Sequence, residues 1–155
     1  MKKLIYAAAF TFLLASNPRA IAGGAMQNAN VPHLIGSAAT PNRAGFQGAT
    51  HRFDLHVQGR TLSEIAIAIP DDLSIRGGIE VKNQSGQKIE TQVSVNNQRA
   101  TLVFSQPVAP DTTISIYMHG INTPGYSRNW GYIISGKMVG VNAEMPLGRV
   151  GIQTY

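Results

Sequence analysis

The sequence predicts an all-β chain folded as an antiparallel sandwich of about eight short strands. Apolar and polar residues alternate in many short segments, and turn-forming residues recur roughly every 8–12 residues. No segment shows the 3.6-residue period of an amphipathic helix. Short strands at this spacing are typical of a sandwich, here an immunoglobulin-like one, or of a small closed sheet.

The first 22 residues have the composition of a secretory signal peptide. Lys2 and Lys3 give a basic start, and residues 4–15 form an uncharged, mostly apolar run. Ala20 and Ala22 form the small-x-small pattern after which a signal peptidase cleaves. The apolar run is too short to span a bilayer. We therefore expect cleavage after Ala22, export to the periplasm or the extracellular space, and no membrane insertion of the exported chain.

Residues 23–49 are rich in Gly, Ala, Asn and Pro, and Arg43 is their only charged residue. Within them, only residues 31–35 could make a short apolar contact. Such a composition is typical of a linker. We expect a flexible N-terminal arm over residues 23–49 and one folded domain over residues 50–155.

The first predicted strands each have one apolar face. Residues 51–57 and residues 64–69 alternate between apolar and other side chains, and a shorter strand is predicted at residues 79–81. Between these strands, the sequence after Pro70 allows one helical turn over residues 71–76.

The second half of the domain continues the same pattern. Asn96 and Asn97 predict a turn, because Asn tolerates positive φ, and Pro107 and Pro110 predict a crossing loop. A further turn is predicted at residues 83–87. The remaining strands are predicted at residues 89–95, 102–104, 114–119, 130–134 and 150–152.

Several short pieces of sequence follow one another in a characteristic order over residues 50–155. They are Phe53–Leu55, Leu62–Ile67, Pro107–Thr112, Asn122–Gly125, Trp130–Tyr132 and Leu147–Ile152. In order and spacing they resemble the cyanobacterial family of exported proteins described as domain of unknown function 2808. Asp111 departs from that family, which usually carries Gly there. The resemblance implies an exported β-sandwich and brings no activity, cofactor or site.

The charge and cysteine content exclude several classes of function. The net charge of +5 falls to +2 without Lys2, Lys3 and Arg19, and the remaining charges are scattered singly. Phosphate binding needs clustered Lys and Arg, so we expect no nucleic-acid partner. The chain has no cysteine, so it has neither disulfides nor thiolate metal ligands. We expect no cofactor.

No motif in the chain predicts catalysis, so we expect that the protein is not an enzyme. Residues 131–137 have the spacing of a phosphate-binding loop but are predicted as a strand. Residues 85–88 have the Ser-x-x-Lys spacing of acyl enzymes but lie in a turn instead of at the start of a helix. Asp71 and Asp72 are adjacent, and adjacent carboxylates rarely face one glycosidic bond from two sides.

The histidines suggest one alternative, a periplasmic copper-carrier-like protein. His51 and His56 face opposite sides of one strand, whereas His56 and His119 both fall on polar faces. The latter two could meet only if their strands are neighbours in one sheet, and imidazole ligands suit copper. Solvated surface histidines without a metal are the simpler interpretation of His33, His51, His56 and His119.

The segment from residue 122 to residue 132 is the strongest candidate for recognition. Its amide, guanidinium and aromatic side chains suit a protein surface or a sugar ring. The candidate binding residues are Asn122, Tyr126, Arg128, Asn129 and Trp130.

A structural interpretation of the same segment remains open. Trp130 and Tyr132 alternate with Gly131 and Ile133, which fits core residues at the start of a strand. The leading hypothesis is a non-enzymatic binding or assembly module of the periplasm or cell surface, whose partner is another envelope protein. A module that binds cell-wall glycan is the second alternative.

Overall fold

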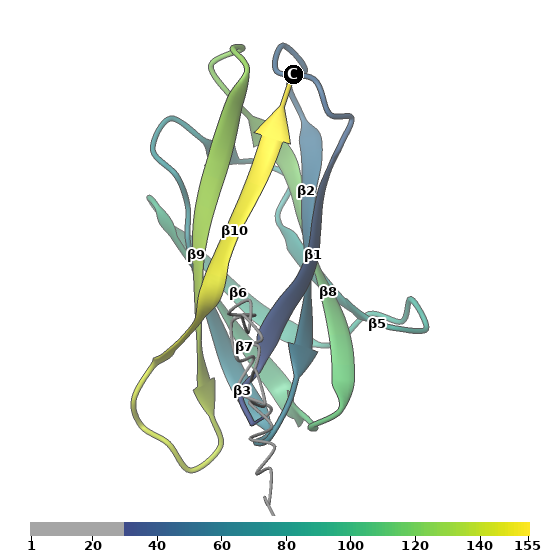
Figure 1. Cartoon of the computed structure of the whole chain (residues 1–155), viewed down its shortest axis with the longest axis vertical. Helices are drawn as coiled ribbons and strands as arrows, with labels where there is room; N and C mark the ends of the chain where they lie inside the picture. The colour runs from purple at the N-terminus through teal and green to yellow at the C-terminus, as the bar shows by residue number, and fades with distance from the viewer. Residues whose placement is uncertain (1–29) are drawn as a thin grey trace, which may run out of the picture.

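Two antiparallel β-sheets pack face to face in the computed structural model, which describes residues 30–155 (Figure 1). The predicted signal peptide, residues 1–22, lies outside the described residues. The strands are β1 (His33–Thr40), β2 (Ala49–Val57), β3 (Leu62–Ala68), β4 (Ser74–Ile75), β5 (Ile79–Asn83), β6 (Thr91–Asn96), β7 (Arg99–Val108), β8 (Thr112–Asn122), β9 (Arg128–Met138) and β10 (Met145–Thr154). The predicted β-sandwich is confirmed, with ten strands where about eight were expected.

Each sheet has five strands. The first sheet has the order β1-β2-β8-β4, and β5 pairs with β8 beside β4; the second has the order β10-β9-β3-β7-β6. No helix in residues 30–155 is long and apolar enough to cross a membrane.

The core consists of the apolar face of each alternating strand. The largest fully buried side chains include Phe53 and Leu55 from the first sheet, and Ile65, Leu102 and Trp130 from the second. Because successive side chains of a strand point to opposite faces, the period-two pattern of the sequence puts them all between the sheets. Each buried side chain of this size contributes roughly 1.5–3 kcal/mol relative to an exposed one.

The expectation of a flexible arm is wrong for residues 33–40, which form β1. This strand pairs with β2, with Leu34 opposite Leu55, and its Leu34 and Ala39 pack against the core. The following loop is also held, because the Gly48 N–H donates to the Ile121 carbonyl at 2.9 Å. The composition did not indicate this strand, because an edge strand with one neighbour buries few side chains. Its apolar and polar residues therefore need not alternate strictly.

Three turns depend on residues with positive φ or on Asn side chains. The Asn83 side-chain oxygen accepts hydrogen bonds from the Ser85 and Gln87 N–H groups, as an Asn-initiated turn requires. Asn97 has φ +49, as predicted, and Asp111 has φ +62, the left-handed conformation that Gly adopts most easily.

The helical turn expected over residues 71–76 does not form. Residues 74–75 instead form β4, because Ser74 pairs with Asn122 and Ile75 pairs with Ile121 on β8. The tertiary pairing with a long central strand outweighs a weak local preference.

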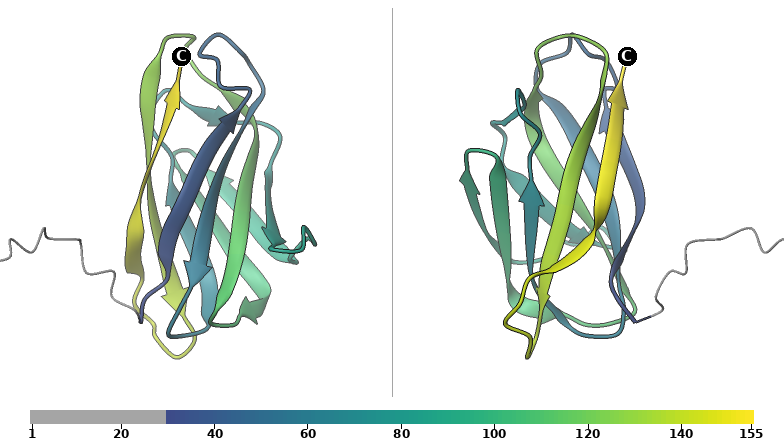
Figure 2. Two further views of the ribbon diagram at one scale, coloured as in Figure 1. Left: turned by 45° about the vertical axis from the view of Figure 1, so that its right-hand side comes forward. Right: turned by 60° about the vertical axis from the view of Figure 1, so that its left-hand side comes forward.

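The edges of the two sheets meet along one side of the sandwich, where β1 lies beside β10 (Figures 1 and 2). We call this contact the β1–β10 seam. The Ser37 hydroxyl donates to the Gly151 carbonyl at 3.3 Å, and a Cβ on Gly148 would lie 2.9 Å from Leu34 Cδ1. The close approach therefore depends on Gly148.

Candidate functional site

The segment predicted to bind lies at one end of the sandwich, beside the loop over residues 41–48 (Figure 1). The two segments are joined because the Thr123 hydroxyl donates to the Ala44 carbonyl and the Gln47 side-chain amide donates to the Thr123 carbonyl, each at 2.9 Å. The Ala44 N–H also donates to the Tyr155 carbonyl at 2.7 Å. We call this end the loop end, and define it by the exposed side chains of Arg43, Phe46, Asp72, Tyr126, Arg128 and Tyr155.

Three side chains of the predicted segment lie against one another. Tyr126, Arg128 and Trp130 share one face of the chain, as the period of two requires. The Arg128 guanidinium carbon lies 5.0 Å from the Trp130 ring centroid, and the Tyr126 and Trp130 ring centroids are 6.2 Å apart. Arg128 also donates to the Tyr126 hydroxyl at 3.3 Å. Cation–π contact of this kind contributes roughly 0.5–1 kcal/mol at exposed sites and fixes the arginine.

Burial decides between the two interpretations of the aromatic residues. Trp130 and Tyr132 are both fully buried, and the Trp130 indole N–H donates to the Thr154 hydroxyl at 3.0 Å. The core interpretation is therefore right for both, and Trp130 is not available to contact a partner. It supports Tyr126 and Arg128, which are exposed above it.

The other two predicted residues differ in accessibility. Asn129 is exposed, and its side chain covers Gly151, where a Cβ would lie 2.7 Å from the Asn129 Oδ1 atom. Asn122 is half-buried in β8 and pairs with Ser74.

Sequence reasoning missed several residues of the loop end. Asp72 forms an ion pair with Arg128, at 3.7 Å between Oδ2 and Nη1. Phe46 is 45% exposed and Tyr155 is 73% exposed, close to or above the 47% of Tyr126. The sequence signal for Phe46 was that it is an aromatic residue isolated in a polar segment. Only the fold shows that this segment lies beside the loop that carries Tyr126.

The pairing of His56 with His119 as copper ligands is wrong. Their strands, β2 and β8, are neighbours, yet the register puts His56 opposite Thr113. His119 lies about six residues farther along β8, which corresponds to about 20 Å. Instead, His56 lies beside His33, with ring centroids 5.4 Å apart. No group of three or more His, Cys, Asp or Glu residues within residues 30–155 could hold a metal ion.

His51 faces the core, unlike the solvated histidines that were expected. Its Nδ1 lies 2.7 Å from the Tyr132 hydroxyl, so the hydrogen bond joins β2 of one sheet to β9 of the other. Burial lowers the pKa of His51 from 6.5 to about 4, and burial also raises the pKa of Tyr132. Both groups are therefore neutral at pH 7, as their position between the sheets requires.

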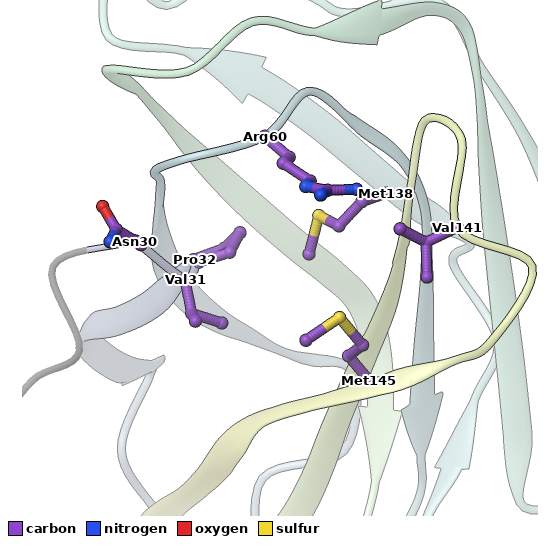
Figure 3. Close-up of a pocket in the computed structure, with 7 residues that line it drawn as sticks. All are labelled: Asn30, Val31, Pro32, Arg60, Met138, Val141 and Met145. Carbon is purple, nitrogen blue, oxygen red and sulfur yellow. The ribbon is translucent and has the colours of Figure 1, made fainter.

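A pocket of about 310 Å³, drawn in Figure 3, lies at the end of the sandwich opposite the loop end. Figure 3 shows the Met138 and Met145 side chains and the Arg60 guanidinium group around the same space. The lining is otherwise apolar, from Val31, Pro32 and Val141, with Asn30 at its rim. Such a pocket suits an apolar group that carries a negative charge.

The outer face of the first sheet carries a second shallow pocket, of about 340 Å³. Its lining includes Tyr117 and Arg52, which are directly opposite each other on β8 and β2. The Tyr117 ring stacks beside His119, and the Lys82 ammonium lies 5.1 Å from its centroid. The buried Nε of Arg52 has no hydrogen-bond partner among residues 30–155.

A family model matches residues 25–135, which is most of the chain. The chain belongs to the family Protein of unknown function (DUF2808). This confirms the family that the sequence resembles, with a match that ends before the last of the quoted pieces, Leu147–Ile152. The match begins before β1 and extends into β9, so the family domain includes the segment that had been expected to be an arm. No curated protein matches this DUF2808 chain.

Two solved structures similar to this DUF2808 chain are an adhesin domain and a pilin subunit. The N-terminal domain of the Streptococcus gordonii adhesin Sgo0707 has a TM-score of 0.56 at 14% identity, over 81% of this chain and 32% of that one. A single-substitution variant of BcpA, the major pilin subunit of Bacillus cereus, has a TM-score of 0.55 at 10% identity, over 80% of this chain and 40% of that one.

A third similar structure is the RrgA Jo.In complex, with a TM-score of 0.51 at 8% identity, over 74% of this chain and 75% of that one. The DUF2808 chain spans about a third of the adhesin structure and two fifths of the pilin. At these identities the similarity establishes the fold alone.

Proposed function

We propose that this DUF2808 protein is an exported, non-enzymatic binding or assembly module of the cell envelope that contacts another envelope protein through its loop end. One observation carries the proposal: three exposed aromatic rings and two arginines gather at one end of the sandwich. Tyr, Phe and Arg are enriched in protein interfaces and account for much of their binding energy. Export rests on the signal-peptide pattern of residues 1–22.

The loop end is also suited to binding because its side chains are held in place. Arg128 is fixed by the Trp130 ring, the Tyr126 hydroxyl and the Asp72 carboxylate. Ordering a free side chain at an interface costs roughly 0.5–1.5 kcal/mol, so this restraint favours binding.

Cross-linking in native cells, followed by mass spectrometry, tests the proposal. We expect Tyr126→Ala and Phe46→Ala to reduce capture of the cross-linked partner while the melting temperature stays nearly unchanged. Ile133→Ala is the matched control, because Ile133 has the same 47% exposure as Tyr126 but lies on β9, on the outer face of the second sheet. Equal capture by all three variants contradicts the proposed site. The same mass spectra test export, which predicts Gly23 as the N-terminal residue.

The outer face of the first sheet favours a second candidate function, binding of cell-wall glycan. Sugar rings stack on aromatic faces, and the exposed part of the Arg52 guanidinium beside Tyr117 could donate a hydrogen bond to a sugar hydroxyl. Sedimentation with purified cell wall tests it: Tyr117→Ala and Arg52→Gln should release the protein from the pellet, and Tyr126→Ala should not. Retention of the Tyr117 and Arg52 variants in the pellet contradicts this candidate.

A further inference from the structure

Three of the four sheet edges are protected from pairing with another strand. The edges β1 and β10 lie against each other along the seam, and both have a bulge, between Leu34 and Gly36 and between Pro146 and Gly148. Pro146 also lacks an N–H group. At the β5 edge the chain folds back, so that the Ile89 N–H donates to the Val81 carbonyl at 2.8 Å. These are devices by which proteins prevent edge-to-edge association.

The fourth edge, β6, has none of these devices. Its sequence, Thr-Gln-Val-Ser-Val-Asn, contains no charge and no proline, and its register with β7 has no bulge. No strand of residues 30–155 pairs with its outer side. A straight, uncharged edge of β-branched residues is a template for another strand.

Two valines add an apolar surface to this edge. Val93 and Val95 lie opposite Leu102 and Ala100, which are fully buried, so they belong to the inner face of the sheet. Yet they are 39% and 42% exposed, because the opposite sheet does not cover them. The core of the sandwich is therefore open at β6.

The backbone of the same two residues faces outward. The Ser105 N–H donates to the Glu90 carbonyl, so residue 90 is in a hydrogen-bonded position opposite β7. These positions alternate along an antiparallel ladder. Ser94 therefore bonds to β7, and the N–H and C=O groups of Val93 and Val95 point away from it.

We propose that a second copy of this chain pairs with β6, antiparallel and around a two-fold axis at Ser94. In this register Val93 of each copy lies opposite Val95 of the other, which gives about four backbone hydrogen bonds. All four valines stay on the inner face, and the two five-stranded sheets become continuous. This interface is separate from the loop end and goes beyond the proposed function.

The occupant is a second copy because the strand complements itself. A two-fold interface requires one patch to fit its own image. Two uncharged strands of equal length meet without like-charge repulsion, and the register around Ser94 matches valine with valine and polar residues with polar residues. A pairing shifted by one residue would instead place valines opposite the polar face.

Sedimentation velocity tests the proposal. The full chain is expressed with its native N-terminus, and the form that the cells produce is purified and measured. We expect a dimer that dissociates on dilution, as a small interface should. Val93→Lys should raise the dissociation constant by about tenfold or more, because lysine blocks edge pairing. Val103→Lys is the control, since Val103 is also 40% exposed but lies on β7, one strand from the edge.

Cross-linking measures the register directly, because the chain has no cysteine of its own. Ser94 lies at a non-hydrogen-bonded position of the new ladder, where opposite Cα atoms are about 4.5 Å apart, within disulfide range. Ser94→Cys should therefore form a disulfide dimer at least about ten times faster than Val103→Cys. A monomer at all concentrations, equal effects of Val93→Lys and Val103→Lys, or equal rates for the two cysteine variants would each overturn the proposal.

Discussion

The two long sides of the sandwich close in different ways. On the seam side, β1 and β10 bring the two sheets together (Figure 2). The His51–Tyr132 hydrogen bond joins the layers on this side, and Trp130 of the neighbouring strand β9 is fully buried. On the opposite side, β6 extends past the other sheet and leaves Val93 and Val95 partly exposed. The same alternating pattern therefore gives a closed core on one side and an open one on the other.

This contrast separates residues that hold the fold from residues free to bind. Without disulfides, the stability of the chain depends on packing and strand pairing. The seam side contributes most of the large buried aromatic surface, so we expect it to dominate the free energy of unfolding. The β6 side contributes less to folding and can bury its valines in an interface.

The largest effect should come from Trp130→Ala, which removes a fully buried ring behind the seam. We expect a loss of about 3–5 kcal/mol in the free energy of unfolding, measured by denaturant titration. The same truncation on the open side, Val93→Ala, should cost less than about 1 kcal/mol at a concentration where the protein is monomeric. Equal losses would contradict the contrast between the two sides.

Acid should weaken the seam side next. The folded pKa of His51 is about 4, against 6.5 unfolded, because burial disfavours the charged ring. The unfolded chain therefore binds the proton first. The stability is fully present above pH 6.5 and falls by about 3 kcal/mol as the pH decreases to 4.

Denaturant titration at each pH measures this loss. His51→Asn, which cannot titrate, should lack it and serves as the control. A wild-type profile that matches that of His51→Asn between pH 6.5 and 4 would show that His51 is not the group responsible.

A smaller effect is expected at the seam itself from Gly148→Ala. Gly148 has φ +145, and a Cβ would lie 2.9 Å from Leu34 Cδ1, so we expect a loss of about 1–2 kcal/mol. Gly131→Ala is the matched control on β9, where a Cβ meets nothing within 4 Å. Thermal unfolding should show a lower melting temperature for the first variant only; the same change in both would mean that the seam is loosely packed.

The smallest effect on stability is expected from Val95→Thr, which keeps the shape of a partly exposed side chain. We expect a change within about 0.5 kcal/mol. The equivalent change on the seam side, Val150→Thr, buries a hydroxyl at a position that is 4% exposed and should cost about 1–3 kcal/mol. Calorimetry of the two variants compares the sides directly, and a larger loss at Val95 would reverse the assignment.

The sequence predicted those parts of the molecule in which local pattern and tertiary environment agree. In strands such as β2, Phe53 and Leu55 alternate with polar residues, so the period of two predicts which side chains are buried. Trp130 and Tyr132 alternate in the same way, and the core interpretation drawn from that alternation is right. The Asn83 turn was predictable because its hydrogen bonds are made within five residues.

The remaining errors concern features that depend on distant parts of the chain. The strand β1 was not predicted, because its extended conformation depends mainly on pairing with β2 and not on its own sequence pattern. His56 and His119 lie on neighbouring strands, but only the register of β2 against β8 shows that they are far apart. Asp72 reaches Arg128 because the strand pairs of β8 bring their loops to one end.

The alternation of the chain was sufficient to predict short strands with one buried face and to favour a sandwich, because burial of one strand face is a local property of period two. The tertiary structure decided which strand edges are covered, which polar groups meet at the loop end, and where the core stays open at β6. Edge protection and register depend on pairing between segments far apart in sequence, which the alternation within a single strand does not specify.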